Sequence, residues 1–491
     1  MTLGLCLLVV VAALVAAVGE ATSPAATPVR STFRSAGQLV LPTVLTAPAA
    51  DEAVSFGWSA DVSGDTAVVV APASGPSGES AGWAYAYVRS NGAWTMQAQL
   101  GPCGQGDVAV SGDTAVVGLD GLARVYVRSG ATWTLQAELS PGPEGRWDDQ
   151  FGRAVAVSGD TAVVGAPHWG PDVDHHCGAV YVFKRSGAAW STETQLTASD
   201  ATSGDDFGAD VALEGDRIVV GASNHALLGA AYVFSRNGST WTQQTELAAD
   251  DGVLYDGFGA SVAISGPLVV VGAPGGAPSS NECGAAYTFQ HSPTEWRQQA
   301  KLVAGDPEVW SGFGGAVAVS DGLVVVGARA HNIGRASDAG AAYAYWSTGQ
   351  TWSLPVRLSA PDAAGDDWFG DVVAISGSTV ATASAHHASA PGQSGEVFVY
   401  TLTRPPAPRV TRLSLTKARR LRVISILGSA FGDVPDSSYV KFGSTRVSAI
   451  RSWSPTSITC KVPIGVRPGR VKVRVVTAGG VSNGSLFTVT R

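Results

Sequence analysis

The stretch FGRAVAVSGDTAVVGAP, residues 151–167, decides the fold of this chain. The same phrase restarts at five other phenylalanines, and a degenerate copy surrounds Gly104-Gln105. The hairpin centres mark seven copies, spaced 47 to 56 residues apart. Repetition at this period indicates an array of one supersecondary unit. The other phenylalanines are Phe56, Phe207, Phe258, Phe313 and Phe369.

Each copy predicts four short strands. Residues 153–158 and 161–166 alternate around a Ser-Gly-Asp turn, which is a strong hairpin signal. A longer loop ends at Gly178, where a third strand begins, and a fourth strand starts at Trp190 and closes at Leu196. Four short antiparallel strands in about 50 residues are typical of a propeller blade. We interpret the tryptophans, which recur at one repeat position, as packing residues between blades.

The seventh repeat ends at Thr401-Leu402 without a tryptophan strand. Residues 39–45, LVLPTVL, align with residues 352–358, WSLPVRL, which form the fourth strand of the sixth repeat. The N-terminal segment is therefore expected to complete blade seven and close the ring, which removes exposed sheet edges. The sequence predicts an all-β protein whose residues 33–403 form a seven-bladed β-propeller.

These repeats resemble the FG-GAP repeats of the integrin α-subunit propeller and its relatives. The resemblance implies recognition outside the cell through the upper face of the propeller. Integrin-like repeats often carry a calcium loop between the first two strands of a blade. Here that loop is cut to Ser-Gly-Asp, which offers too few oxygen ligands for calcium, so no calcium site is expected in these hairpins.

A second module follows a stiff linker, residues 404–408, with the sequence RPPAP. Residues 471–475, VKVRV, alternate as a half-buried strand should. The phrases GSAFG (428–432), VKFG (440–443) and WSPTSI (453–458) resemble the IPT/TIG domain. That resemblance implies an immunoglobulin-like β-sandwich over residues 409–491. Such modules are spacers or protein-binding units in extracellular proteins, and some contact DNA in transcription factors.

The chain begins with an apolar run from Leu3 to Val18 that ends in small residues. The run is shorter than a bilayer span, so we interpret residues 1–21 as a cleaved signal peptide; an uncleaved anchor is the alternative. No later segment is apolar enough to cross a membrane. The sequence therefore predicts a secreted or cell-surface protein, and export argues against a nucleic acid partner.

Charge divides the chain into two unequal parts. From Arg404 onward there are sixteen Lys or Arg and two Asp, a charge near +14, whereas the remainder is near −22. Fields of opposite sign predict that the C-terminal module docks on the propeller or meets an anionic partner. A basic face that simply contacts water is the alternative.

Histidines and aspartates gather in loops on the face that the resemblance makes the ligand-binding one. Imidazole and carboxylate groups together suit a zinc-class ion, and the densest cluster lies in the loop of blade three. A polar loop whose Asp, Gly and Pro shape turns is the alternative. The candidate metal ligands are His168, Asp172, Asp174, His175 and His176.

Three functions remain open from the sequence. Non-catalytic recognition of a protein ligand through the upper propeller face is favoured. A lectin that holds glycans between blades, using repeated Trp and Tyr side chains, is the first alternative. A propeller hydrolase or lyase is the second, with the blade-three loop as its one candidate site. No catalytic residue and no cofactor are assigned.

Overall fold

The structure is a computed structural model that describes residues 34–35, 38–39, 41–48, 55–72, 82–143, 145–170, 176–275, 283–386, 395–432 and 438–491. The interpreted signal peptide lies outside these residues. Apart from two 3-10 turns, η1 (Trp147–Asp149) and η2 (His225–Leu227), the regular structure is strand. Within the described ranges, no helix is long and apolar enough to cross a membrane.

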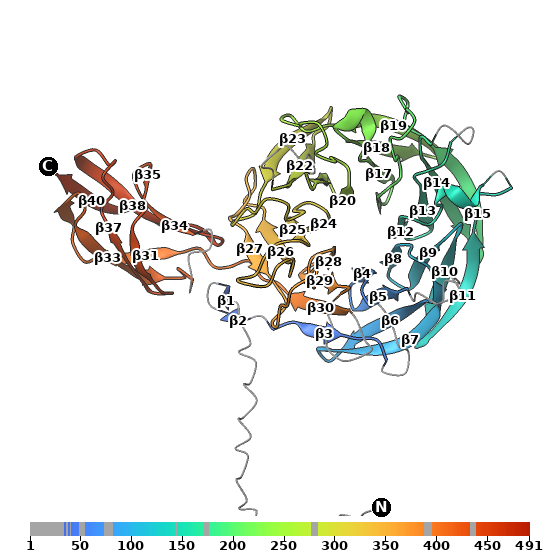
Figure 1. Ribbon diagram of the computed structural model, residues 1–491, viewed down its shortest axis with the longest axis horizontal. Helices are drawn as coiled ribbons and strands as arrows, with labels where there is room; N and C mark the ends of the chain where they lie inside the picture. The colour runs from blue at the N-terminus through green and yellow to red at the C-terminus, as the bar shows by residue number, and fades with distance from the viewer. Residues whose placement is uncertain are drawn as a thin grey trace, which may run out of the picture.

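Seven four-stranded antiparallel sheets stand around a central channel as propeller blades (Figure 1). This arrangement confirms the predicted fold class. In each blade the strand that follows the Phe-Gly position is innermost. The strands of the first four blades are β4 (Ser59–Ser63), β5 (Thr66–Ala71), β6 (Gly82–Ser90), β7 (Ala93–Cys103), β8 (Val108–Ser111), β9 (Thr114–Leu119), β10 (Leu122–Ser129), β11 (Thr132–Leu139), β12 (Val155–Ser158), β13 (Thr161–Ala166), β14 (Ala179–Ser186), β15 (Ala189–Leu196), β16 (Val211–Glu214), β17 (Arg217–Ala222), β18 (Ala230–Asn237) and β19 (Thr240–Leu247).

The last blade takes its outermost strand from the other end of the chain. Strand β3 (Thr43–Leu45) pairs antiparallel with β30, with Thr43 opposite Val399 and Leu45 opposite Val397. A short hairpin of β1 (Arg34–Ser35) and β2 (Gln38–Leu39) precedes it. The strands of blades five to seven are β20 (Ser261–Ser265), β21 (Leu268–Ala273), β22 (Ala285–His291), β23 (Trp296–Leu302), β24 (Val317–Ser320), β25 (Leu323–Ala328), β26 (Ala341–Trp346), β27 (Val356–Leu358), β28 (Val372–Ser376), β29 (Thr379–Ser384) and β30 (Glu396–Thr401).

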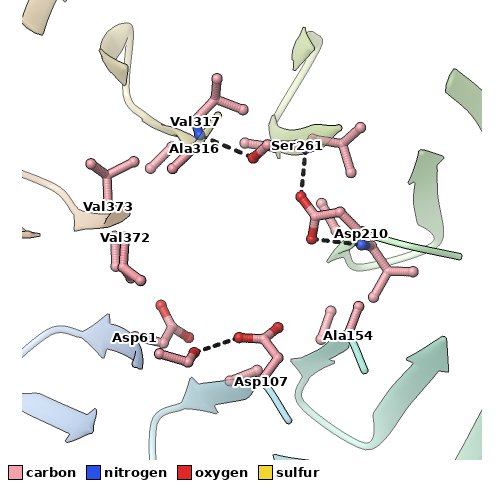
Figure 2. Close-up of a pocket in the computed structure, with 18 of the residues that line it drawn as sticks. Asp61, Asp107, Ala154, Asp210, Ser261, Ala316, Val317, Val372 and Val373 are labelled. Carbon is pink, nitrogen blue, oxygen red and sulfur yellow. Dashed lines mark hydrogen bonds between the residues drawn. The ribbon is translucent and has the colours of Figure 1, made fainter. Parts of the chain in front are cut away.

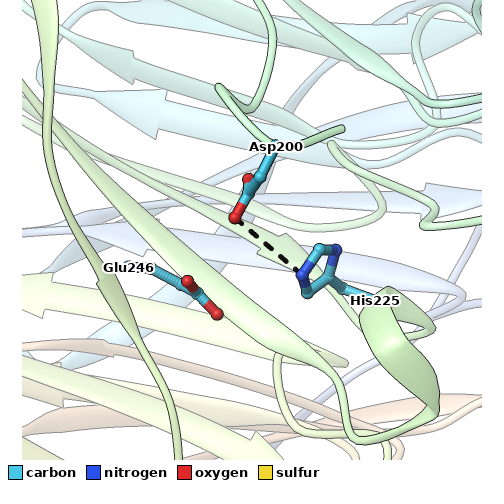
Figure 3. A group of neighbouring side chains, drawn as sticks. All are labelled: Asp200, His225 and Glu246. Carbon is cyan, nitrogen blue, oxygen red and sulfur yellow. Dashed lines mark ion pairs between the residues drawn. The ribbon is translucent and has the colours of Figure 1, made fainter. Parts of the chain in front are cut away.

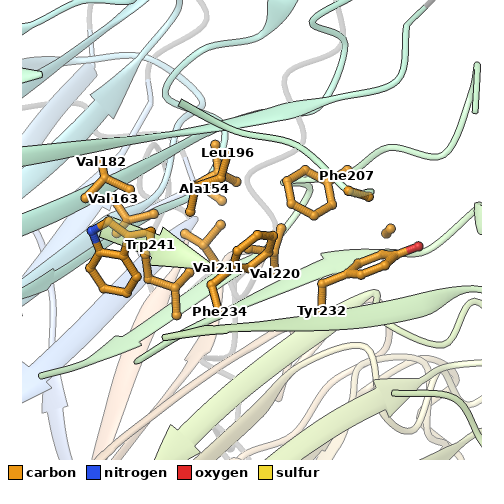
Figure 4. Packing of buried hydrophobic residues seen from close by; sticks show 14 of the residues in the cluster. Ala154, Val163, Val182, Leu196, Phe207, Val211, Val220, Tyr232, Phe234 and Trp241 are labelled. Atoms are coloured by element: carbon orange, nitrogen blue, oxygen red, sulfur yellow. The ribbon is translucent and has the colours of Figure 1, made fainter. Parts of the chain in front are cut away.

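The hydrophobic core lies between neighbouring blades. Every residue of β13 is buried because the second strand of a blade is covered on both faces, which explains its continuous apolar run. Side chains of blade three pack against Phe207 and Tyr232 of blade four, whose rings meet edge to face with centroids 5.5 Å apart (Figure 4). The Phe-Gly phenylalanine thus lies in the core between blades wherever the phrase is kept; the core between blades one and two has none.

In blade three the Ser-Gly-Asp turn bonds to the neighbouring blade and to the third strand of its own blade. The Ser158 hydroxyl accepts the N–H of Gly215 in the next blade (3.2 Å). The carboxylate of Asp160 pairs with Arg185 (2.7 Å), and Arg185 also donates to Thr114 of the preceding blade (3.0 Å). The turn is therefore a structural clasp in blade three, and its aspartate is bound to an arginine.

The repeated tryptophans connect blades through a bulge in the fourth strand. Between Val182 and Phe183 the register of β14 with β15 shifts by one residue, so that Glu193 is left unpaired in the ladder. Its carboxylate accepts the indole N–H of Trp241 in the next blade (2.9 Å). Bulges re-aim side chains in this way. Equivalent indole bonds run from Trp133 to Gln97, Trp190 to Gln136 and Trp352 to Gln299.

The C-terminal module is a two-sheet sandwich beside the ring (Figure 1). It has its own core, in which the Phe442 and Phe487 rings meet edge to face. Arg404 of the linker donates to the carbonyl of Ser347 in blade six (3.3 Å). The strands are β31 (Arg409–Leu413), β32 (Lys417–Arg419), β33 (Val423–Ser429), β34 (Tyr439–Phe442), β35 (Thr445–Arg446), β36 (Ile450–Trp453), β37 (Ser457–Lys461), β38 (Gly469–Thr477), β39 (Gly480–Val481) and β40 (Ser485–Thr490).

Candidate functional site

One face of the propeller carries two kinds of loop, those between the second and third strands and those that join blades. The backbone N–H of Tyr255, in a joining loop, donates to the carbonyl of Leu227, in the loop after β17 (2.6 Å). Gly229 and Phe258 form a parallel bridge beside them. We call this the upper face. It is the face on which the sequence placed the histidines and most of the loop aspartates.

Two large aromatic side chains project from this face at equivalent positions. Tyr255 and Trp310 each lie three residues before the Phe-Gly phenylalanine of their blade. Their side chains are 56% and 55% exposed. Both residues have a left-handed backbone, with φ of 68° and 67°. Bulky residues rarely adopt this conformation, and such strain gathers at functional sites.

Exposed aliphatic side chains lie in the same loops. Leu254 precedes Tyr255, and Val309 precedes Trp310, in the joining loops of blades five and six. Leu227 and Leu228 come from the loop after β17; the Leu227 carbonyl accepts the N–H of Tyr255, and the Leu228 carbonyl accepts that of Phe258. We call this set the apolar loop patch. Its members are Leu227, Leu228, Val253, Leu254, Tyr255, Val309 and Trp310, all of them exposed.

Many of the upper-face carboxylates hold loops together instead of facing solvent. The Asp205 carboxylate accepts the N–H of Thr202 (2.6 Å) and is almost fully buried. Asp256 accepts the N–H of Val253 in the same way (2.7 Å). This geometry is an Asp-capped turn, repeated from blade to blade. The equivalent carboxylates are Asp149, Asp205, Asp256 and Asp367.

Of the five metal ligands expected in blade three, His168 and His176 are described. Their ring centroids are 5.7 Å apart, and the Nδ1 of His176 lies 2.6 Å from the carbonyl oxygen of His168. Asp172, Asp174 and His175 lie outside the described residues. The blade-three metal site therefore stays a prediction.

A second cluster, which the sequence did not single out, lies between blades three and four. Asp200 of the joining loop, His225 of η2 and Glu246 of β19 converge there (Figure 3). Their nearest ligand atoms all lie within 4.8 Å of one another. Asp200 and His225 belong to loop classes that the sequence did point to. Glu246 was missed because it sits in an alternating strand without any unusual neighbour.

The central channel is a third polar site, with a volume of about 550 Å³. Asp61, Asp107 and Asp210 line it from the innermost strands (Figure 2). Burial in the surrounding protein raises the pKa of Asp61 to about 7, and burial together with the Asp107 charge does the same for Asp210. Burial also raises the pKa of Asp107.

The channel aspartates bind backbone groups of the next blade. Asp61 accepts the N–H of Val110 (2.7 Å), and Asp210 accepts the N–H of Val262 (2.7 Å). Ser261 does the same for Val317 (3.0 Å). Innermost strands have one unpaired edge, so these side chains supply the missing acceptors. These carboxylates therefore have a structural role, which is to hold neighbouring blades of the ring together.

Comparison with known families identifies both parts of the chain. The FG-GAP repeat pattern matches residues 133–183, 190–234, 241–289, 296–345 and 352–400. The IPT/TIG domain pattern matches residues 408–489. A comparison with curated proteins gave no match.

Solved structures with a similar arrangement are distant in sequence. A fungal alcohol oxidase of the AA5 family, in complex with copper, is 12% identical, with a TM-score of 0.43 over 91% of this chain and 99% of that one. The β-propeller domain of the Trilobed protease from Pyrococcus furiosus is 11% identical, with a TM-score of 0.41 over 70% of this chain and 91% of that one. Similarities this low carry no functional argument.

Proposed function

The chain belongs to the FG-GAP repeat proteins and carries an IPT/TIG domain, and we propose that it recognises a protein ligand outside the cell, without catalysis, through the upper face of its propeller. The apolar loop patch is the proposed contact surface. Export rests on the apolar run from Leu3 to Val18.

The conformation of Tyr255 and Trp310 carries this proposal. The backbone at this repeat position is left-handed in four blades, where blade four has Gly204 and blade seven has Asp366. Glycine and aspartate adopt this conformation at little cost, whereas a bulky side chain adds about 1 kcal/mol or more of strain. Two aromatic residues that are strained and half exposed do not serve folding. Their rings are available to a partner.

The chemistry of the patch favours a protein partner. Tyr255 and Trp310 each follow an exposed aliphatic residue in the chain, and aromatic side chains are enriched at the centre of protein interfaces. The patch draws on loops of blades four to six, and the charged residues Asp250 and Glu308 lie in the same loops.

The lectin alternative depends on aromatic side chains between blades. Those tryptophans are engaged within the protein. The Trp190 indole N–H donates to Gln136 (2.8 Å), and the Arg185 guanidinium lies 5.2 Å from its ring centroid. This engagement favours a protein ligand over glycans held between blades.

The test is a parallel screen of residues 22–491 against an array of extracellular proteins and an array of glycans. We expect saturable binding to a protein target. The double variant Tyr255→Ser/Trp310→Ser should weaken binding about 30-fold or more, because the loss of even one central aromatic residue costs about 2 kcal/mol or more. Its unfolding temperature should not fall, since both side chains are exposed.

A matched control is Leu135→Ser, which removes an exposed apolar side chain from β11 on the outer rim. Binding that is equal in wild type and the double variant would refute the patch as the contact surface. Selective glycan binding that free sugar abolishes would establish the lectin alternative instead.

A further inference from the structure

Blades four, five and six share an arrangement at the junction with the preceding blade. The third strand carries a tyrosine, and the residue opposite it on the fourth strand lies beside an aspartate of the joining loop. In blade five these residues are Tyr287, Lys301 and Asp251. The aspartate is four residues past the closing leucine of the preceding blade in all three cases.

Blades five and six each place a cation against the aspartate. Lys301 Nζ lies 2.8 Å from Asp251, and the Tyr287 hydroxyl also donates to Asp251 (3.0 Å). In blade six Arg357 pairs with Asp306, and the Tyr343 hydroxyl donates to it (2.7 Å). Although burial opposes it, hydrogen bonds from His331 and Tyr343 and the Arg357 charge lower the pKa of Asp306 to about 2.

Blade four lacks that cation. Glu246 stands opposite Tyr232, where the neighbouring blades have lysine and arginine. Within the part of the chain that the structure describes, neither Asp200 nor Glu246 forms an ion pair with a lysine or an arginine. Two carboxylates therefore face each other in the place where a carboxylate and a cation stand in the equivalent junctions.

The Tyr232 hydroxyl gives independent evidence of a missing group. Tyr232 is fully buried, and among the described residues its Oη meets no group in full hydrogen-bond geometry, although the Asp200 carboxylate lies near enough to interact with it. Burial, and then the nearby Asp200 carboxylate, raise the pKa of this hydroxyl. Its counterparts Tyr287 and Tyr343 are both bonded. Leaving a buried hydroxyl unbonded costs about 1–3 kcal/mol.

His225 is oriented as metal-binding histidines are. Its Nδ1 lies 3.0 Å from the buried Asp205 carboxylate, and its Nε2 lies 4.0 Å from Asp200. A carboxylate on one ring nitrogen fixes the tautomer and turns the other nitrogen toward a metal. His225 does not stand in for the lysine or arginine that blade four lacks. Blade six has the equivalent histidine, His331, and still places Arg357 against its aspartate.

We propose that Asp200, His225 and Glu246 bind one divalent transition-metal ion of the zinc class at the junction of blades three and four. Asp205 holds His225 in position, and the Tyr232 hydroxyl donates to a carboxylate of the ligand set. Imidazole favours zinc-class ions over calcium and magnesium, which take oxygen ligands. Asp200 and Glu246 are exposed and can rotate, so bonds of about 2.0–2.2 Å are within their reach.

The test uses the mature chain, residues 22–491, with any affinity tag removed and metal stripped by chelation. Isothermal titration with Zn²⁺ should show one site per chain, and Co²⁺ should give the visible absorption bands of a protein-bound ion. Ca²⁺ and Mg²⁺ should not compete at equal concentration. Bound Zn²⁺ should raise the unfolding temperature.

The decisive variant is Glu246→Lys, which gives blade four the residue of blade five. We expect Zn²⁺ affinity to fall on the order of 100-fold or more, and the Co²⁺ bands to vanish. The metal-free variant should be at least as stable as metal-free wild type, since lysine satisfies Asp200. His291→Gln, which removes a histidine of β22 in blade five, is the matched control and should bind Zn²⁺ as wild type does. His168→Gln tests separately whether the blade-three loop holds the ion.

Two results would overturn this site. One is a wild-type chain that takes up no stoichiometric Zn²⁺. The other is Zn²⁺ binding that survives in Glu246→Lys but is lost in His168→Gln, which would move the metal to the blade-three loop.

Discussion

Asp61 and Asp210 show how the channel couples charge to stability at the scale of single residues. Each carboxylate is bound to two backbone N–H groups while its pKa in the folded protein is about 7, against 3.8 as its ordinary value. The folded state therefore holds more protons than the unfolded state between about pH 4 and 7. In that window the free energy of unfolding falls as pH rises, and it levels off above the folded pKa.

The variant Asp61→Ala tests this coupling, because alanine occupies the position in the other six blades. At pH 5 the variant should be less stable than wild type, since it lacks the bonds to Val62 and Val110. Between pH 5 and pH 8 the difference in unfolding free energy between variant and wild type should shrink by about 1–2 kcal/mol. This figure is lower than the pKa shift alone would give, because solvent screens charges in the channel. Urea denaturation at both values measures the change, and a pH-independent difference would contradict it.

At this scale the sequence could identify residue types but not their surroundings. Asp200 and Asp205 lie in one loop and look equivalent in the sequence. In the structure Asp205 caps a turn and is buried, whereas Asp200 is exposed toward His225. The sequence alone does not mark Glu246 as a site residue. It stands out only once the structure shows that Lys301 and Arg357 occupy the equivalent places in blades five and six.

At the scale of elements, the second strands of blades two to six carry a glycine just before their last residue, where the neighbouring blade leaves no room for a side chain. A Cβ at Gly221 of β17 would lie 2.0 Å from the carbonyl oxygen of Gly259 in blade five. The equivalent glycines of blades three, five and six each face the carbonyl of the Phe-Gly glycine in the following blade. In blade four the facing backbone would have to move to admit a Cβ, whereas blade seven has Ala383 at this position, beside Gly57. Gly221→Ala should cost more than about 3 kcal/mol of unfolding free energy or prevent folding.

Gly215→Ala is the matched control for Gly221→Ala. Gly215 has a φ of +57° in the hairpin turn, but a Cβ there meets nothing within 4 Å. Its cost should stay near 1 kcal/mol. Equal losses in the two variants, measured by thermal denaturation, would show that close approach between blades is not the reason for Gly221.

The strands themselves could be predicted, because the repeat aligns seven copies of one pattern. The bulge at Glu193 could not. A bulge shifts the register of a strand without changing its composition, and β15 still alternates on either side of it. The structure is consistent with the interpretation of the tryptophans as packing residues between blades. The sequence did not predict that their indole N–H groups also donate hydrogen bonds to the bulged residue of the preceding blade.

At the scale of the whole molecule, ring closure depends on one short strand. Leu45 of β3 is 3% exposed and belongs to the core shared by blades one and seven. Leu45→Ala should lower the unfolding free energy of the propeller by about 2–5 kcal/mol. Val44→Ala, on the exposed side of the same strand, should change it by less than about 0.5 kcal/mol. Calorimetry of both variants tests whether closure stabilises the ring as one unit.

The relation between the two domains was less accessible from the sequence. The opposite charges of propeller and sandwich predicted docking or an anionic partner. In the structure the sandwich lies beside the ring, with Arg404 bonded to blade six. Net charge sets the sign of a long-range field and not the orientation of a domain. Docking of the basic domain on the acidic propeller stays a prediction.

Pairing of β3 with β30 also fixes an order of events during synthesis. The first strand of the propeller to leave the ribosome is the last to find its partner, because β30 follows more than 350 residues later. Until β3 pairs with β30, blade seven lacks its outermost strand. Blade one, for its part, has no completed blade seven to pack against. Contacts this far apart in sequence form slowly and leave strand edges open to other chains. For this protein, the interval between the first and last blades is when misassembly with a second nascent chain is most favoured.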